Sequence, residues 1–122
     1  MAGVSDEFLE LQEASAAGDL KIVRQLLDAG TDLNADYGAP RGWSPLMKAA
    51  FHGHLPVVQL LVKRGARLDA VEIDRWWTAL DLALYAKRTK VADYLKSVKT
   101  PLGEKVPNPH RKGKLGGWTE HE

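Results

Sequence analysis

The chain has 122 residues, of which 44% are hydrophobic and none is cysteine, so it can form one small domain but has neither disulfides nor thiolate metal sites. Its net charge of +1 conceals an acidic beginning, because residues 1–37 contain eight acidic and two basic side chains while residues 38–122 contain eight acidic and fifteen basic ones. No apolar run approaches the ~20 residues of a membrane-spanning helix, and residues 1–7 lack the basic and apolar segments of a signal peptide. We therefore expect a cytoplasmic protein with no membrane partner.

The first predicted helix follows Ser5, whose hydroxyl is suited to cap a helix that begins at about Asp6. Acidic side chains in its first turn interact favourably with the positive end of the helix dipole. Its apolar side is expected to consist of Leu9, Ala14 and Ala17. Gly18 should end this helix.

A second helix is predicted between Asp19, which can cap it, and Gly30, which tolerates the left-handed conformation just past a helix end. Its apolar residues follow helical spacing and are Ile22, Val23, Leu26 and Leu27.

The same plan then repeats. Residues 18–35 and 53–70 align without a gap at a spacing of 35, with seven of 18 positions identical. A further copy begins 34 residues on, where Trp77-Thr78-Ala79-Leu80 matches Trp43-Ser44-Pro45-Leu46. Repetition at this period is typical of a solenoid, in which each unit buries its apolar face against its neighbours.

The second copy begins both of its helices with proline. Pro45 and Pro56 stand near the first helical position, where the missing N–H of proline does no harm. Two pairs of small residues, Ala16-Ala17 and Ala49-Ala50, should let helices of neighbouring units pack closely.

The repeated residues resemble the ankyrin pattern. Residues 42–55 read GWSPLMKAAFHGHL, which is similar to G-x-T-P-L-H-x-A-A-x-x-G-H. Residues 56–66 resemble the following V-V-x-L-L-L-x-x-G-A, and residues 30–35 resemble G-A-D-V-N-A. The resemblance covers about residues 6–98 and implies an all-α ankyrin-repeat solenoid of helix-turn-helix units joined by extended, hairpin-like loops.

We expect an ankyrin domain in residues 1–99, with units at about 6–37, 38–71 and 72–99. An acidic first unit and a basic end would then give the stack a charge gradient. This gradient is either a set of solvated faces of mixed sign or a field that orients a charged partner. Residues 100–122 show no period and should form a flexible tail; docking on the last repeat through Leu102, Val106 or Trp118 is the alternative.

The end units depart from the pattern. Gln25 stands where the second unit has Leu60, as expected for an outer face exposed to water, and Lys96 and Lys99 replace Val62 and Gly65, so the third unit should be the last. The histidine of the motif is Met47 in the second unit and Asp81 in the third, and Lys87-Arg88 replaces the Gly-His pair of the third unit. These departures leave open whether the hydrogen bonds between loops are regular.

No catalytic constellation is present in the sequence. His52 and His54, separated by one residue, could share a metal ion, but no thiolate or nearby carboxylate completes the site. The resemblance also gives His54 a structural role. We therefore expect no catalytic residue, no metal and no cofactor, and a small metal-dependent hydrolase built on His52 and His54 is the rival hypothesis.

The basic segment 110–114, HRKGK, could contact nucleic acid. A nucleic-acid-binding protein normally shows a basic face on its folded part as well. A solvated tail is the preferred interpretation, so no nucleic-acid partner is expected.

The resemblance implies a concave face, formed by loop tips and inner helices, that holds partners. Its variable positions map to Arg41, Trp43, Phe51, His52, Asp74, Arg75, Trp76, Trp77 and Tyr85. Trp, Tyr and Arg dominate interface hot spots, although rings such as Trp43 and Trp77 could instead pad the core between loops. The leading hypothesis is a monomeric, non-enzymatic module that binds a folded protein partner and no small-molecule substrate. The alternative is a dedicated inhibitor or immunity-type protein that blocks an enzyme or toxin.

Arg75, Trp76 and Trp77 are expected to form the centre of this face. In the family register Trp77 is the position that faces a ligand, whereas Trp76 replaces a glycine and has no room inward. Both rings are therefore expected to be partly exposed.

Overall fold

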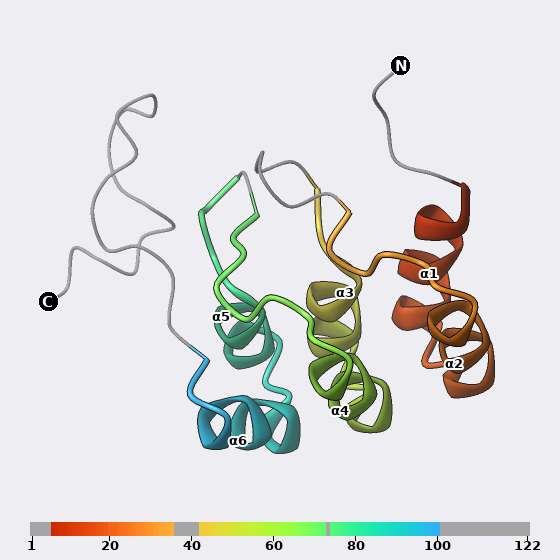
Figure 1. The fold of residues 1–122 in the computed structure, drawn as a ribbon. Helices are drawn as coiled ribbons and strands as arrows, with labels where there is room; N and C mark the ends of the chain where they lie inside the picture. The colour runs from red at the N-terminus through yellow and green to blue at the C-terminus, as the bar shows by residue number, and fades with distance from the viewer. Residues whose placement is uncertain (1–5, 36–41, 73, 101–122) are drawn as a thin grey trace, which may run out of the picture.

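The structure is a computed structural model that describes residues 6–35, 42–72 and 74–100 (Figure 1). These residues form six helices and no strand, which confirms the all-α prediction. The helices are α1 (Asp6–Ala17), α2 (Leu20–Asp28), α3 (Pro45–His52), α4 (Leu55–Lys63), α5 (Ala79–Tyr85) and α6 (Thr89–Ser97). None of these helices is long and apolar enough to cross a membrane.

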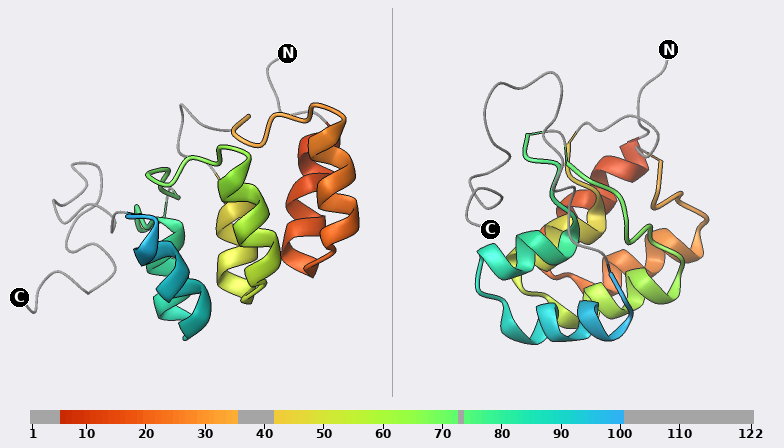
Figure 2. Two further views of the ribbon diagram at one scale, coloured as in Figure 1. Left: turned by 60° about the horizontal axis from the view of Figure 1, so that its bottom comes forward. Right: turned by 90° about the vertical axis from the view of Figure 1, so that its left-hand side faces the viewer.

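The helices form three antiparallel pairs that stand side by side in chain order (Figure 1). Within the stack α3 contacts α1 and α5, and α4 contacts α2 and α6. The result is an inner layer of α1, α3 and α5 and an outer layer of α2, α4 and α6, visible in the end-on view of Figure 2. The loops that join one pair to the next extend from the same end of the stack (Figure 1).

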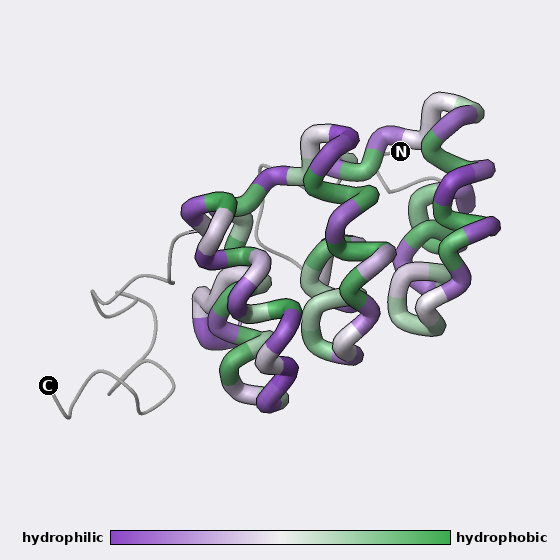
Figure 3. The backbone as a smooth tube through the Cα atoms, turned by 90° about the horizontal axis from the view of Figure 1, so that it is seen from below, coloured by the Kyte–Doolittle hydropathy of each residue, from purple (hydrophilic) through white to green (hydrophobic). Residues whose placement is uncertain are grey.

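The core lies between the two layers and between neighbouring units, where the helices present their apolar residues (Figure 3). Val23, Val58 and Leu61 of the outer layer have no exposed surface, as the helical spacing predicts. Gln25 is exposed whereas Leu60 is buried, which confirms that this side of the first unit faces water.

The apolar side of α1 differs from the prediction. Leu9 is 45% exposed and Ala17 is exposed, whereas Phe8 and Leu11 are fully buried together with Ala14. Phe8, Leu11 and Ala14 recur at spacings of three, which places them on one stripe of the helix, and Leu9 lies off that stripe.

The pair of small residues that is buried in α1 also differs from the predicted pair. Ala49 and Ala50 have no exposed surface, and their equivalents 35 residues earlier are Ala14 and Ser15, which are buried as well. The predicted pair Ala16-Ala17 lies one half-turn further along, and its second member is exposed.

The position of the motif histidine is used differently in each unit. In the first unit Gln12 donates a hydrogen bond from Nε2 to the backbone carbonyl of Trp43 in the second. Met47 is a core residue with 2% exposure. Asp81 forms a capping box with Thr78 at the start of α5, in which its Oδ2 accepts from the Thr78 N–H at 2.9 Å. The residue that replaces the motif histidine therefore makes a different contact in each unit.

The turns between the two helices of each unit share one conformation. Gly18, Gly53 and Lys87 all have positive φ, of +76°, +80° and +61°. Directly after the turns of the second and third units, the residue before the outer helix reaches back to the preceding unit. His54 Nε2 lies 2.9 Å from the Ala16 carbonyl oxygen, and Arg88 Nε donates to the Phe51 carbonyl oxygen at 2.9 Å. The structural role expected for His54 is thus present, and Arg88 performs the same role in the third unit.

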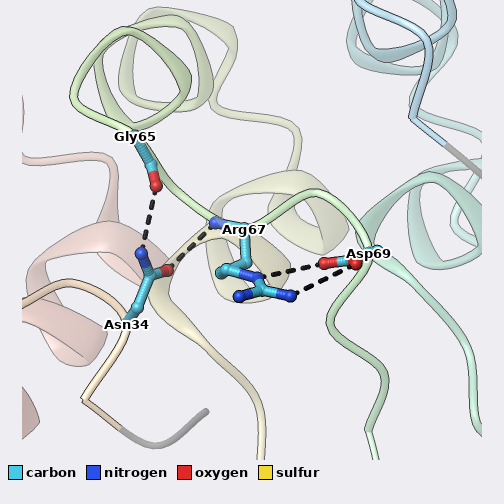
Figure 4. A network of polar contacts seen from close by, with 4 residues as sticks. All are labelled: Asn34, Gly65, Arg67 and Asp69. Atoms are coloured by element: carbon cyan, nitrogen blue, oxygen red, sulfur yellow. Dashed lines mark hydrogen bonds and ion pairs between the residues drawn. The ribbon is translucent and has the colours of Figure 1, made fainter.

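The long loops are joined by a polar bridge between the first and second units (Figure 4). Asn34 donates from Nδ2 to the Gly65 carbonyl at 3.0 Å and accepts at Oδ1 from the Arg67 N–H at 3.0 Å. The Arg67 guanidinium in turn pairs with Asp69 at 3.2 Å. One asparagine side chain therefore fixes the spacing of two successive loops.

The third unit extends one residue beyond the predicted boundary. Thr100 is only 6% exposed, and its N–H donates to the Leu95 carbonyl at 3.0 Å, as Ala66 does to Leu61 in the second unit. The remainder of the predicted tail, residues 101–122, lies outside the described residues, as does Ser5.

Candidate partner-binding face

The predicted site residues lie on α3, on α5 and on the loops that precede these helices. We call the exposed side of α1, α3 and α5, with the described parts of those loops, the inner face. Arg41 lies outside the described residues. The other predicted residues fall into two aromatic pairs, one loop and one histidine, which are described in turn.

The first aromatic pair is Trp43 and Phe51, both half-buried. Their ring centroids lie 5.1 Å apart in an edge-to-face arrangement, which is a favoured geometry for aromatic rings. The Lys48 ammonium lies 5.5 Å from the centre of the Trp43 ring, within the range of a cation–π contact.

The second pair, Trp77 and Tyr85, repeats the first one 34 residues later. Its centroids lie 5.5 Å apart, and the Arg75 guanidinium lies 5.1 Å from the Trp77 ring. The second and third units thus each combine a loop tryptophan, a helix aromatic residue and a cation. Tyr85 is 66% exposed and neighbours Leu84, which is 43% exposed, so the third unit presents more apolar surface than the second.

Of the two adjacent tryptophans, only Trp76 is partly exposed as the sequence predicts. Trp77 was expected to face a ligand, but only 7% of it is exposed and it belongs to the core. Trp76 is half-buried with φ of +62°. The positive φ turns the chain at Trp76, so the next residue, Trp77, enters the stack beneath Arg75 and Tyr85. Both indole N–H groups are buried and have no hydrogen-bond partner among residues 6–35, 42–72 and 74–100.

Glu72 positions this loop, and sequence reasoning missed it. The residue has no exposed surface. Its Oε1 accepts from the Asp74 N–H at 3.0 Å, and its Oε2 accepts from the N–H groups of Arg75 at 2.8 Å and Trp77 at 3.3 Å. Its own backbone N–H donates to the Trp77 carbonyl at 3.0 Å. The carboxylate therefore acts as the centre of a compact turn that presents Asp74 and Arg75 at the surface.

His52 is exposed at the end of α3, beside three basic groups. Partial desolvation of its ring, followed by the positive charges of His54, Lys48 and Arg88, lowers its pKa below the usual 6.5. The rings of His52 and His54 are stacked with centroids 6.3 Å apart. His54 Nε2, however, is directed to the Ala16 carbonyl, away from any shared ligand position. Within residues 6–35, 42–72 and 74–100, no three histidine, aspartate or glutamate side chains gather closely enough to hold a metal ion.

A family model described as ankyrin repeats in three copies matches residues 11–103 of this chain. The chain belongs to the ankyrin-repeat family. Ankyrin repeats are in general non-enzymatic protein–protein interaction modules.

The similar curated proteins contain ankyrin repeats within much longer chains. Ankyrin repeat and SAM domain-containing protein 6 of Danio rerio is 39% identical over 92 residues, which cover 75% of this chain and 12% of that protein. Its counterpart in Mus musculus is 37% identical over 82 residues, 64% of this chain and 9% of that protein. Ankyrin repeat and KH domain-containing protein mask-1 of Caenorhabditis elegans is 40% identical over 85 residues, 70% of this chain and 3% of that protein. The chain therefore spans only a small part of each of these ankyrin proteins.

Proposed function

We propose that this ankyrin-repeat chain is a non-enzymatic module that binds a folded protein partner through its inner face. The observation that carries the proposal is the exposure of Tyr85 above Trp77 and Arg75, next to the exposed Leu84. Exposed apolar and aromatic groups that adjoin one another on a protein surface mark interaction sites. Tyr and Arg are also the residue types that contribute most to protein interfaces.

The described residues of the loop that presents Arg75 are held by contacts within the chain. Three backbone N–H groups are held by the buried Glu72 carboxylate, and the Trp77 ring is fixed in the core. Association therefore does not incur the conformational entropy of ordering this loop, which is a main cost of binding. A preformed loop beside an exposed tyrosine supports recognition of a folded surface.

The test is capture of partners from the source cells on the immobilised full chain, followed by titration of the purified partner. Arg75→Ala combined with Tyr85→Ala should weaken binding by at least ~2 kcal/mol, as for interface hot spots. We do not substitute Trp77, because its ring is only 7% exposed and its loss would also disturb the core.

A matched control is Gln59→Ala combined with Lys63→Ala, two exposed positions on α4 of the outer layer. This control should leave the affinity unchanged, and both double variants should keep the circular dichroism of the original chain. A partner released by the α4 variant and not by the inner-face variant would contradict the proposal. The cytoplasmic location, the monomeric state and the inhibitor alternative stay predictions of the sequence.

A further inference from the structure

Three basic side chains lie on or beside α3, with Lys48 in the middle of the helix and His52 and Arg88 at its C-terminal end. Lys48 and His52 lie four residues apart on the helix, which places them on one face. Arg88 reaches the same end of α3 from the start of α6, with its Nε 2.9 Å from the Phe51 carbonyl oxygen. We call Lys48, His52 and Arg88 the basic cluster.

The basic cluster has no negative counterpart in the described part of the chain. None of its three side chains forms an ion pair there, although Arg64 and Arg67 each pair with an aspartate. Every charge that perturbs His52 is positive. The only acidic residue of α3 and α5 is Asp81, which is buried in the capping box. The cluster is therefore a local positive potential on the inner face.

Helix ends of both signs lie near the basic cluster. Arg88 is the residue before the first turn of α6, and His54 precedes α4 in the same way. Neither gives its helix a side-chain cap, because both side chains reach back to the preceding unit. The uncapped positive ends of α4 and α6 and the negative end of α3 thus lie near the cations Lys48 and Arg88 and the His52 ring.

We propose that the basic cluster binds a carboxylate of an acidic segment of the protein partner. The proposal rests on the proposed function and specifies its partner. The segment would place an aspartate or glutamate among Lys48, His52 and Arg88, with its neighbouring apolar residues on Phe51 and the exposed Tyr85. Charge-assisted hydrogen bonds from these donors to a carboxylate supply orientation as well as affinity.

The acidic side chains of the first unit favour a protein segment over a nucleic acid as the ligand of the basic cluster. Glu13 of α1 occupies, 35 residues earlier, the position of Lys48, and the exposed side of α1 also carries Asp6, Glu7 and Glu10. A nucleic acid repeats its negative charge at every nucleotide, so its strand would be repelled where the inner face turns acidic. A peptide can carry one carboxylate at α3 and neutral or basic residues over α1.

The probe is a phage-displayed library of random peptides, selected on the immobilised full chain at low salt. Peptides that bind should be enriched in Asp and Glu relative to the unselected library, and their affinity should fall as salt is raised. Synthetic copies of selected peptides are then titrated against variants of the full chain.

The neutralising variant combines Lys48→Gln with Arg88→His. Histidine can keep the hydrogen bond to the Phe51 carbonyl, as His54 does to Ala16, and at about pH 8 it carries no charge. This variant should weaken acidic peptides about tenfold or more. The matched control, Lys63→Gln with Lys90→Gln, removes two exposed positive charges from the outer layer and should change affinity by less than about twofold. Glu13→Gln should tighten binding, because it removes the nearest negative position on α1.

The following results of the peptide selection and of a DNA-binding assay would overturn the inference. The selected peptides could show no acidic enrichment and still lose binding in the Arg75→Ala/Tyr85→Ala variant. This result would reject an acidic segment as the ligand but would support the proposed function. Peptides insensitive to both inner-face variants, or a failure to select any peptide, would overturn the acidic segment, and titration of the captured folded partner then decides the proposed function separately. Binding of a duplex DNA that the neutralising variant abolishes, without binding of acidic peptides, would assign the cluster to nucleic acid.

Discussion

The second and third ankyrin units have the same backbone but not the same residues at their turns. Gly53 and Gly65 adopt φ of +80° and +95°, and the residues in their places, Lys87 and Lys99, adopt +61° and +63°. The hydrogen bonds also match, since His54 N–H donates to Ala49 and Arg88 N–H donates to Ala83. The backbone of the repeat thus imposes the left-handed conformation even on residues that do not favour it.

The difference between the two units comes from what lies above each turn. A Cβ atom at Gly53 would come within 2.8 Å of the Arg88 side chain, which lies over that turn. Lys87 is exposed, so its side chain extends into solvent where such a neighbour would stand. Glycine is therefore required at Gly53 by space as well as by conformation, whereas the third unit needs only the conformation. Which residue is tolerated at such a turn therefore depends on the side chains of the neighbouring unit as well as on the backbone conformation of its own unit.

The largest expected effect tests the position of the second unit between its neighbours. Leu61→Ala should lower the free energy of unfolding by about 2–5 kcal/mol, because it leaves a cavity at a fully buried site. Its equivalent Leu95→Ala should cost less, since α4 packs against the outer helices α2 and α6 on its two sides, while the main contacts of α6 are with α4 and α5. Urea unfolding of both variants gives the comparison, and a loss below about 1 kcal/mol for Leu61→Ala would mean that the buried face is misassigned.

The next effect concerns the loop of the third unit whose described residues are organised around the Glu72 carboxylate. Glu72→Gln should lower the free energy of unfolding by about 1–3 kcal/mol. Both carboxylate oxygens accept from backbone N–H groups, so the glutamine NH₂ must face at least one donor. Urea unfolding measures the loss, and Glu10→Gln on the exposed side of α1 is the control. Equal effects of the two substitutions would show that the buried carboxylate does not hold the loop.

The sequence predicts the repeat well because its signals are periodic. Gly18, Asp19 and Gly30 mark turns and caps at fixed spacing, and the structure shows the Asp19 cap as expected, with Oδ1 accepting from the Ile22 N–H at 3.2 Å. The orientation of α1 was not predictable in the same way. Leu9 and Leu11 are chemically alike, and only packing against the neighbouring helices decides which one is buried.

The candidate site was harder to predict for the same reason. The aromatic residues and Arg75 were found from composition and register, yet the burial of Trp77 depends on the positive φ of Trp76, which has no sequence signal. Glu72 resembled any surface acid in the sequence. Its role follows from three N–H groups that converge only once the loop is folded.

The contact between units can be tested by exchanging the residues of the two units. Arg88→Ala should lower the free energy of unfolding by about 0.5–1.5 kcal/mol, because it removes the hydrogen bond to the Phe51 carbonyl. Arg88→His should recover most of this loss, since His54 makes the equivalent bond in the second unit. Thermal unfolding of the three proteins measures both effects. A histidine variant as unstable as the alanine variant would show that the two side chains are not equivalent.

A smaller effect of opposite sign is expected at the turn itself. Lys87→Gly should raise the free energy of unfolding by about 0.5 kcal/mol, because relief of the left-handed strain exceeds the added flexibility of the unfolded chain. Lys96→Gly, inside α6, should instead lower it by up to about 1 kcal/mol. Urea unfolding distinguishes the two signs. A loss of stability in Lys87→Gly would mean that the lysine side chain itself contributes to the third unit.

The smallest effect is a pH dependence of stability at His52, to which both the second and the third unit contribute. Partial desolvation, and then the charges of His54, Lys48 and Arg88, lower the pKa of His52 below 6.5 in the folded chain. The unfolded chain therefore takes up this proton more readily, so the contribution of His52 to stability is fully present above about pH 6.5 and is lost as the pH falls below it. His52→Gln removes this term while leaving the other titrating groups in place. Urea unfolding of both proteins at about pH 7.5 and about pH 5 should show the variant gaining stability relative to the original chain on acidification. A difference that stays constant with pH, or that changes in the other direction, would mean that the pKa of His52 is not lowered in the folded chain.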